Sequence, residues 1–327
     1  MNGADKFVVS HAPFWHGGTR LSTRHYHIML ALAPAALMGV ARFGPTALGV
    51  LGLSMASAML WELAANLVSK KPVSIGDANA ALIGLLVAML LPASAPWWLV
   101  VTGTFLAVIV GKQIYGGIGG NPFNPVLVAV AILSLSWKNR MDFDAALLSY
   151  DPGFWMAYPL AALKHFGPSA VSRFQAWDLL MGRQCGGIGA VFGLGLVCGG
   201  LYLLARGIIR WEICVSFLAG VALTAWLFTV FGNPANAPAR FAGPVFHLLT
   251  GYTLIGAFFL ATGDSSSPVN FWPMLLFGGL AGAMTVLIRN TGAWVDGVVF
   301  AILLLNTAQP LLDMIRPKAL GKVADDA

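Results

Sequence analysis

The ten residues from Gly116 to Pro125 combine the residue types in this chain that are best suited to build a binding site. They read Gly-Gly-Ile-Gly-Gly-Asn-Pro-Phe-Asn-Pro. Glycines permit backbone shapes closed to other residues, and prolines fix the start of the next helix. Asn121 and Asn124 each offer two donors and one acceptor, and buried amides need partners. Two interpretations stay open: the amides bind a flat heterocycle such as an isoalloxazine, or they cap a helix and bond to local backbone.

Several ionisable residues stand apart within or beside apolar stretches. Glu62 lies inside such a stretch, where a carboxylate is costly and therefore a functional candidate. Asp77 precedes another stretch and is expected to cap its helix. Asp264 and Asp296 lie in turns and could cap helices or contact ions. His247 begins a further stretch, and we expect it at the membrane interface.

The cysteines do not form a cofactor site. Cys185, Cys198 and Cys214 have no Cys-x-x-Cys spacing, whereas iron–sulfur and zinc sites need more ligands at closer intervals. We expect Cys198 and Cys214 to be buried thiols, and we predict no metal site. The chain also lacks a Gly-x-Gly-x-x-Gly motif after a strand, so direct contact with NADH is not expected.

The composition places the chain in the membrane class. Of 327 residues, 58% are hydrophobic and only 10% are charged, whereas soluble domains carry about 25% charged residues. The net charge of +6 is scattered among apolar segments, which argues against a nucleic-acid surface. Residues 1–27 are polar and have no apolar core, so no cleavable signal peptide is predicted.

Apolar stretches of spanning length predict an all-α polytopic membrane protein with about ten transmembrane helices. Ala-Leu-Ile-Gly at residues 81–84 and Thr-Leu-Ile-Gly at residues 253–256 each open a helix before a turn, which suggests two five-helix inverted repeats. The predicted stretches are 27–43, 46–68, 78–94, 96–114, 123–137, 187–206, 212–232, 245–262, 271–289 and 293–312.

The distribution of Lys and Arg over the short loops predicts that both termini are cytoplasmic. The resulting division is a cytoplasmic N-terminal segment (1–26), a first transmembrane repeat (27–137), a periplasmic loop segment (138–186), a second repeat (187–312) and a cytoplasmic tail (313–327). The predicted location is the inner membrane, as a multi-pass protein.

The segment at residues 116–125 resembles the signature of a family that comprises the D subunits of Rnf electron-transport complexes and the B subunits of Na⁺-translocating NADH:quinone reductases. Ala-Thr-Gly-Asp-Ser-Ser-Ser-Pro at residues 261–268 is similar to the family's Ala-Thr-Asp-x-x-Thr-Ser-Pro. Further segments follow in the family's order at residues 187–189, 285–289, 296–298 and 300–306, and the resemblance spans about residues 25–317. The chain length favours the Rnf D subunits.

The resemblance implies a non-covalent riboflavin against Asn121 and Asn124. Gly119 and Gly120 belong to the same segment, residues 116–125, which we call the hinge. The family also carries FMN esterified to a threonine in a Ser/Asp-Gly-Ala-Thr-Pro-Leu motif. Here the acceptor position holds Tyr158, in Ala-Tyr-Pro-Leu, and no threonine lies between Thr104 and Thr224. A phosphothreonyl bond in this loop is therefore impossible.

Three possibilities remain for the FMN site. FMN could bind without a covalent bond, with Trp155 or Tyr158 stacking on the ring and Lys164 or Arg173 holding the phosphate. A tyrosyl or seryl ester could replace the phosphothreonyl bond. The pocket could also be empty or differently used, in which case the aromatic residues are interfacial anchors.

The resemblance implies a subunit that passes electrons between NADH and ferredoxin branches, coupled to H⁺ or Na⁺ translocation, and that is not catalytic alone. Its partners would be the A, B, C, E and G subunits of an Rnf complex and the lipid bilayer. The alternative is a cofactor-free channel or transporter for a small solute, which an inverted repeat would also suit.

Overall fold

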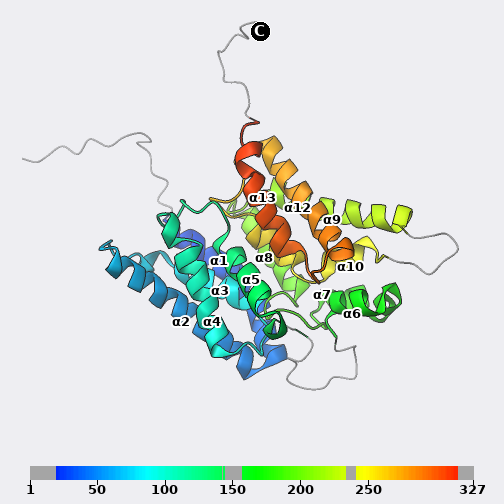
Figure 1. Ribbon diagram of the computed structural model, residues 1–327, viewed down its shortest axis with the longest axis horizontal. Helices are drawn as coiled ribbons and strands as arrows, with labels where there is room; N and C mark the ends of the chain where they lie inside the picture. Colours follow the sequence, from blue (N-terminus) through cyan, green and yellow to red (C-terminus); the bar gives the residue numbers. More distant parts are fainter. Residues whose placement is uncertain (1–19, 142, 144–156, 233–240, 316–327) are drawn as a thin grey trace, which may run out of the picture.

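The computed structural model describes residues 20–141, 143, 157–232 and 241–315, and within these ranges all regular secondary structure is helical (Figure 1). Five helical segments are long and apolar enough to cross a membrane, which confirms the predicted all-α class. These are α1 (Leu21–Phe43), α2 (Pro45–Val68), the segment Trp97–Tyr115 that begins with α4 (Trp97–Phe105), α9 (Trp211–Gly232) and α12 (Phe271–Thr291).

Four shorter apolar helices complete the bundle. They are α3 (Asn79–Leu90), α5 (Pro125–Ser136), α8 (Gly193–Ala205) and α13 (Val298–Leu312). At 1.5 Å per residue, the 12 residues of α3 rise only about 18 Å, whereas the hydrocarbon core is about 30 Å thick. Such half-helices leave backbone groups inside the bundle that other segments must satisfy.

Residues 187–192, which precede α8, show how the bundle satisfies these backbone groups. The sequence predicts a helix from residue 187, but α8 begins only at Gly193. Residues 187–192 instead lie against the end of α3, where the Ile188 N–H donates to the Leu91 carbonyl at 3.1 Å and the Gly189 N–H donates to Met89 at 3.0 Å. The Tyr252 hydroxyl donates to the Leu90 carbonyl at 2.6 Å.

The predicted helix 245–262 is also interrupted. It consists of α10 (Pro244–Leu249), α11 (Thr253–Ile255) and a wide turn at Gly256–Leu260. The break occurs at Gly251, whose φ of 65° lies in the left-handed region that favours glycine. The break leaves the Tyr252 N–H without a partner in the helix, and this N–H donates to Asp296 Oδ2 at 2.7 Å.

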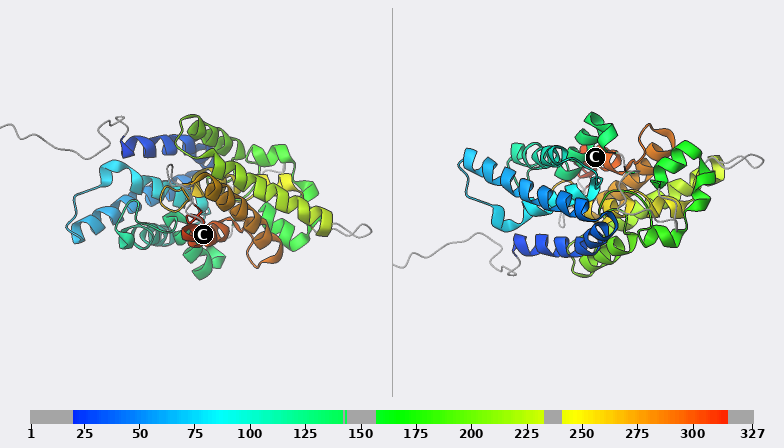
Figure 2. Two further views of the ribbon diagram at one scale, coloured as in Figure 1. Left: turned by 90° about the horizontal axis from the view of Figure 1, so that it is seen from above. Right: turned by 90° about the horizontal axis from the view of Figure 1, so that it is seen from below.

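Glycines set the closest helix contacts. A Cβ at Gly282 of α12 would lie 2.1 Å from the Phe217 carbonyl of α9, and one at Gly199 of α8 would lie 2.1 Å from the Ala31 carbonyl of α1. Small residues allow such backbone approach within membranes. Viewed from above and below, α2–α4 gather on one side and α9–α12 on the other, while α1 packs on α8 and α5 on α13 between them (Figure 2).

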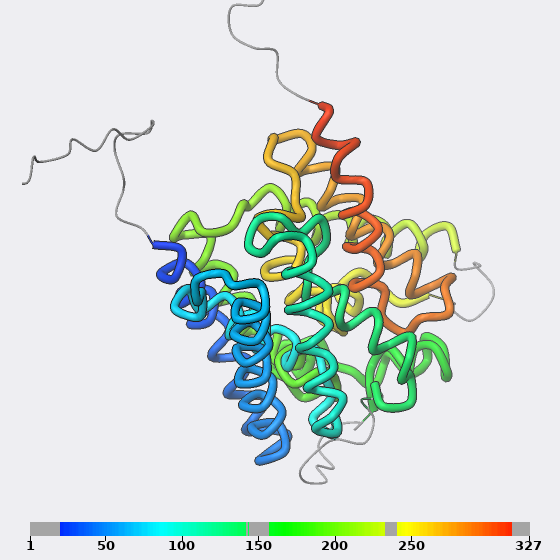
Figure 3. The backbone as a smooth tube through the Cα atoms, turned by 60° about the vertical axis from the view of Figure 1, so that its left-hand side comes forward, coloured from blue at the N-terminus to red at the C-terminus, as the bar shows by residue number. Residues whose placement is uncertain are grey.

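The first and last described residues lie toward the same end of the bundle (Figure 3). We call this the terminal end; it includes the start of α1, the 206–210 turn, the 262–270 loop and the end of α13. The opposite end holds two short helices, α6 (Pro159–Phe166) and α7 (Ala176–Leu180), and residues 291–297.

One prediction about burial is wrong, that for Cys198. His247, for which the sequence predicts a position at the membrane interface, is buried in the protein because α10 packs between α9 and α7, and its depth in the membrane stays a prediction. Neither ring nitrogen of His247 has a hydrogen-bond partner among the described residues. Cys198 is exposed on the outer surface of α8, whereas Cys185 and Cys214 are buried. An apolar stretch does not reveal which helix face meets lipid.

Candidate functional site

A cavity of about 380 Å³ lies near the terminal end, where α3 and α5 begin. We call it the inner cavity. Its volume falls within the range of about 300–1,000 Å³ that is typical of ligand pockets, and its wall is mostly apolar with a few polar groups. Residues that line it include Ile28, Leu82, Leu86, Val126, Leu203, Phe258, Phe259, Asn79, Lys112, Gly119, Asn121, Asn124, Thr262 and Ser266.

Several residues of the glycine-rich hinge, among them Gly119, Asn121 and Asn124, line the inner cavity. Gly119 lines the cavity with a φ of 86°, a conformation that favours glycine. Gly120 does not line it; a Cβ there would lie 2.4 Å from the Tyr115 carbonyl. Asn121 is buried and lines the cavity, and its Nδ2 donates to the Phe123 carbonyl at 2.8 Å.

Asn124 joins the hinge to the second half of the chain. Its Oδ1 caps α5 by accepting the Val126 N–H at 3.0 Å, and its Nδ2 donates to the Leu260 carbonyl at 2.9 Å. The helix-cap interpretation is therefore confirmed for this residue. Asn124 also lines the inner cavity, and each amide nitrogen carries two hydrogens. Capping and ligand contact are thus compatible at this position.

The side-chain amide of Asn306, on α13, supports the hinge. With its oxygen facing the Asn124 N–H at 3.0 Å, the Asn306 amide donates to the Ser266 carbonyl at 2.9 Å and the Ile302 carbonyl at 3.2 Å. Asn306 is itself buried. One side chain therefore links the start of α5, the 262–270 loop and α13 beside the inner cavity.

A buried ion pair lies in the cavity wall. Lys112 Nζ donates to Glu62 Oε1 at 2.7 Å, and the side chains are only 2% and 1% exposed. Ser74 donates to the same carboxylate oxygen at 2.8 Å. Glu62 was singled out from the sequence, but its partner was not, because nothing local shows that Lys112 turns inward. The pair places a cation at the inner cavity.

Polar groups also close the cavity on the side of α1. Arg24 forms an ion pair with Asp264, and its Nη2 donates to the Ile208 carbonyl at 2.9 Å. Asp77 was predicted to cap α3; the N-cap is Ala78, and Asp77, one residue earlier, instead accepts the N–H of Asn79, the first residue of α3, at 2.8 Å. The Asn79 side-chain oxygen is buried without a partner among the described residues. A ligand donor would satisfy it.

A smaller cavity of about 260 Å³ lies at the opposite end; we call it the outer cavity. Tyr158 lines it, and its hydroxyl donates to Asp296 Oδ2 at 3.5 Å. Burial, followed by the negative charge of Asp296, raises the pKa of the Tyr158 phenol well above its usual value. The phenol therefore remains protonated at neutral pH. Lys138, Phe143, His165, Tyr252, Trp294 and Phe300 also line this cavity.

Lys164 does not line the outer cavity. Its ammonium donates to the carbonyls of Gly292 and Trp294 at 2.6 and 2.7 Å and so fastens α6 to the turn before α13. Burial and the nearby Lys138 lower the pKa of Lys164. Trp155 lies outside the described residues. The structure thus brings Tyr158 to a cavity and gives Lys164 a bracing role.

A buried network stands between the outer cavity and the break in the 245–262 segment. Arg289 Nη2 donates to Asp296 Oδ1 at 2.9 Å, and Nη1 donates to the His247 carbonyl at 2.9 Å. The guanidinium also bonds to Thr253 Oγ1 at 2.9 Å and the Thr250 carbonyl at 3.2 Å. Arg289 therefore satisfies carbonyl groups at the end of α10, and the Asp296 carboxylate neutralises the charge of Arg289.

Comparison with known proteins gives a consistent result over nearly the whole chain. Residues 8–321 match the NQR2, RnfD, RnfE family. The chain belongs to this family. It is 34% identical to the D subunit of the ion-translocating oxidoreductase complex of Escherichia fergusonii, over 96% of this chain and 98% of the relative. It is 35% identical to the D subunit of the proton-translocating ferredoxin:NAD(+) oxidoreductase complex of Clostridium ljungdahlii, over 94% and 93%.

Membership of the NQR2, RnfD, RnfE family confirms the resemblance drawn from the hinge and the second-half motifs. Together with the apolar helices, it makes this chain an integral membrane protein. Sequence reasoning missed the roles of Lys112, Asn79 and Asn306, which lie on three separate elements in or beside the cavity wall. The polar residues within apolar stretches were the available signal, but it does not show which of them converge.

Proposed function

We propose that this chain is the flavin-carrying membrane subunit of an Rnf-type complex. In this role it passes electrons between NADH and ferredoxin branches, coupled to translocation of H⁺ or Na⁺. The names of its relatives describe subunits of ion-translocating oxidoreductase complexes, one of them named for ferredoxin and NAD(+). The NADH and ferredoxin sites belong to other subunits in this proposal, and the flavin supplies the electron-transfer chemistry.

The observation that carries the proposal is the composition of the inner cavity. Apolar and aromatic side chains form most of its wall, while the amides of Asn121, Asn124 and Asn79 and the Lys112 ammonium supply donors and acceptors. An isoalloxazine is flat, with apolar faces and a polar edge of mixed donors and acceptors. We place non-covalent riboflavin here, with Gly119 allowing close approach of the backbone.

The outer cavity is the proposed position for FMN if the subunit carries a second flavin. Its aromatic side chains suit a ring, and Lys138 and His165 lie in its wall. Tyr158 already donates to Asp296, which makes it a poor ester acceptor. Lys164 is committed to two carbonyls, so phosphate binding would fall to Lys138 rather than Lys164. Such an FMN would be held without a covalent bond.

We further propose that the helices form two inverted five-helix repeats in the inner membrane, with both termini cytoplasmic. The later helices support this: a short or broken helical segment before a proline-containing turn, then a long segment and a shorter helix, occur in each half, as α3, Trp97–Tyr115 and α5 and as α10–α11, α12 and α13. The pairs α1 with α8 and α5 with α13 occupy matching places in the two halves and touch each other. The partners would be the A, B, C, E and G subunits.

The direct test is the visible spectrum of the purified chain and of its complex. We expect flavin absorbance in the blue, and release of riboflavin by denaturation in roughly equimolar amount. The alternative function, a cofactor-free channel or transporter for a small polar solute, rests on the polar groups in the inner cavity and predicts no visible absorbance. A folded, purified chain without flavin absorbance would reject the flavin proposal in favour of that alternative, whereas absorbance of the whole complex can also come from cofactors of other subunits.

A further inference from the structure

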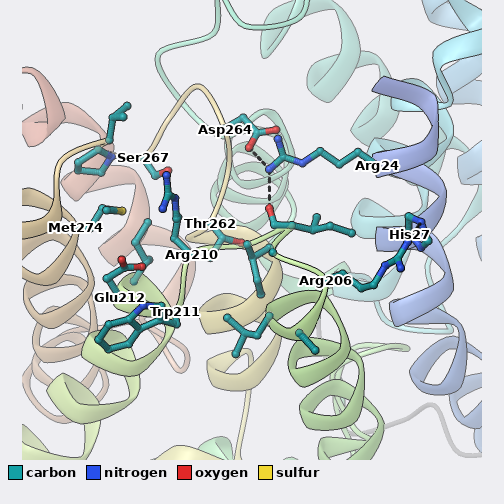
Figure 4. A pocket seen from close by; sticks show the side chains of 18 of the residues that line it. Arg24, His27, Arg206, Arg210, Trp211, Glu212, Thr262, Asp264, Ser267 and Met274 are labelled. Carbon is teal, nitrogen blue, oxygen red and sulfur yellow. Dashed lines mark hydrogen bonds and ion pairs between the residues drawn. The ribbon is translucent and has the colours of Figure 1, made fainter. Parts of the chain in front are cut away.

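A larger cavity opens at the terminal end and shares part of its wall with the inner cavity. Figure 4 shows side chains that line it. We call it the basic cavity. Its volume is about 940 Å³, and it lies between the start of α1, the turn from α8 to α9 and the 262–270 loop. Arg24, Ile209, Thr262 and Asp264 line both cavities, so the ion pair of Arg24 and Asp264 forms part of the partition between them.

Positive charge predominates in the basic cavity. Arg20, Arg24, Arg206 and Arg210 line it, against the carboxylates of Asp264 and Glu212. Asp264 is already paired with Arg24. In the part of the chain that the structure describes, the other three arginines form no ion pair. Arg206 Nη2 instead lies 3.3 Å from the ring nitrogen Nε2 of His27.

The basic cavity lies at the level where a membrane meets water. Trp211, the first residue of α9, lines the cavity and is 53% exposed. Its ring centroid is 6.4 Å from that of Phe271, the first residue of α12, and Phe271 contacts the exposed Trp272. Exposed Trp residues at the ends of spanning helices mark the headgroup region of a bilayer. Exposed Trp211 and Trp272 thus indicate that the arginines of the cavity lie near the depth of lipid headgroups.

The remaining wall fits a lipid with a hydroxyl-bearing headgroup. Glu212 is buried, and its Oε2 has no hydrogen-bond partner among the described residues, so it can accept a hydroxyl. Leu204, Ile208 and Met274 provide apolar contacts beside the charges. Below the rim, α9 and α12 expose Val215, Leu223 and Leu276, along which acyl chains can run.

We propose that the basic cavity binds the headgroup of an anionic glycerophospholipid of the phosphatidylglycerol type. The phosphodiester pairs with Arg206 and Arg210, because guanidinium groups bind phosphate through charge-assisted hydrogen bonds. The headgroup hydroxyl donates to Glu212. Basic pockets between spanning helices bind anionic headgroups in other membrane proteins. This inference is independent of the proposed flavin.

Native mass spectrometry of the full chain in mild detergent, titrated with phosphatidylglycerol or phosphatidylcholine, tests the proposal. Arg206→Gln together with Arg210→Gln should weaken binding of phosphatidylglycerol on the order of tenfold. Binding of phosphatidylcholine should stay weak throughout. Lys70→Gln with Lys71→Gln is the matched control, since it removes two charges at the same end from outside the cavity and should leave lipid affinity unchanged.

Several results would overturn the proposal. Equal affinity for phosphatidylglycerol in the arginine variant and the wild type would show that the basic cavity does not bind this lipid. Displacement of the lipid by inorganic phosphate alone would identify a site for a free anion. In the assembled complex, a cross-link from position 206 to a partner subunit would assign the cavity to protein. If the double variant does not fold, the salt dependence of binding by the wild type tests the proposal. Binding should weaken as the salt concentration rises, and binding that does not depend on salt would contradict the assignment.

Discussion

Asn124 combines a structural role with the proposed ligand contact, and the two can be separated by substitution. Its oxygen caps α5, whereas its nitrogen reaches Leu260 beside the inner cavity. Asn124→Ser keeps a good cap but removes the amide. We expect this variant to lose most of its bound riboflavin, and to lose stability through the missing bond to the Leu260 carbonyl but not through the cap.

Asn124→Ala should lose riboflavin and be about 1 kcal/mol less stable than Asn124→Ser, because both lack the bond to Leu260 but only the alanine variant also lacks the cap. Asn121→Ala should lose riboflavin as well, since Asn121 lines the same cavity. Flavin content is measured by fluorescence after denaturation of a known amount of protein. Unchanged flavin in all three variants would remove both residues from the site.

The buried pair of Lys112 and Glu62 gives a second prediction at the residue scale. Lys112→Met leaves the Glu62 carboxylate buried and unpaired, which should cost about 3–5 kcal/mol. Adding Glu62→Gln removes that charge and should restore much of the loss. Thermal unfolding in detergent compares the three proteins. A single variant as stable as the wild type would show that the pair contributes little.

At the scale of elements, the contact between α9 and α12 depends on glycine. A Cβ at Gly282 meets the Phe217 carbonyl of α9 at 2.1 Å, so Gly282→Ala should destabilise the protein by about 1–3 kcal/mol. Gly49 on α2 is the matched control, because a Cβ added there would have no other atom within 4 Å. Gly49→Ala should be neutral or slightly stabilising. Equal unfolding temperatures for the two variants would contradict this packing.

Most helices could be predicted from the sequence, because ten long apolar stretches leave few alternatives in a membrane. The breaks in these helices could not be predicted. Residues 187–192 and 250–252 lie within the predicted apolar stretches, but several of their backbone groups bond to distant partners such as Leu91 and Asp296. Hydropathy measures burial in lipid, but the end of a half-helix depends on which segment lies next to it.

The site was predictable to a similar extent. The hinge asparagines were singled out because buried amides need partners, and Glu62 because it interrupts an apolar stretch. Asn79, Lys112 and Asn306 could not be grouped with them, since their convergence is a property of the tertiary packing. Lys164 was assigned to phosphate from its sequence position, whereas the structure gives its donors to two carbonyls.

At the scale of the whole molecule, the absence of threonine between Thr104 and Thr224 excludes a phosphothreonyl flavin in the loop before α6. We therefore expect no flavin to remain with the chain after denaturing electrophoresis. In-gel fluorescence is the measurement, with a covalent flavoprotein as the positive control. A fluorescent band at the 34.5 kDa of this chain would show that another residue has taken the acceptor role.

The occupant of the inner cavity decides whether this chain carries a flavin, and a density map of the intact complex tests it directly. We predict a flat three-ring density between the hinge asparagines and Phe258, within contact of Lys112. Density for lipid or protein alone in that cavity, in a complex that retains electron-transfer activity, would contradict the assignment of this chain as a flavin carrier.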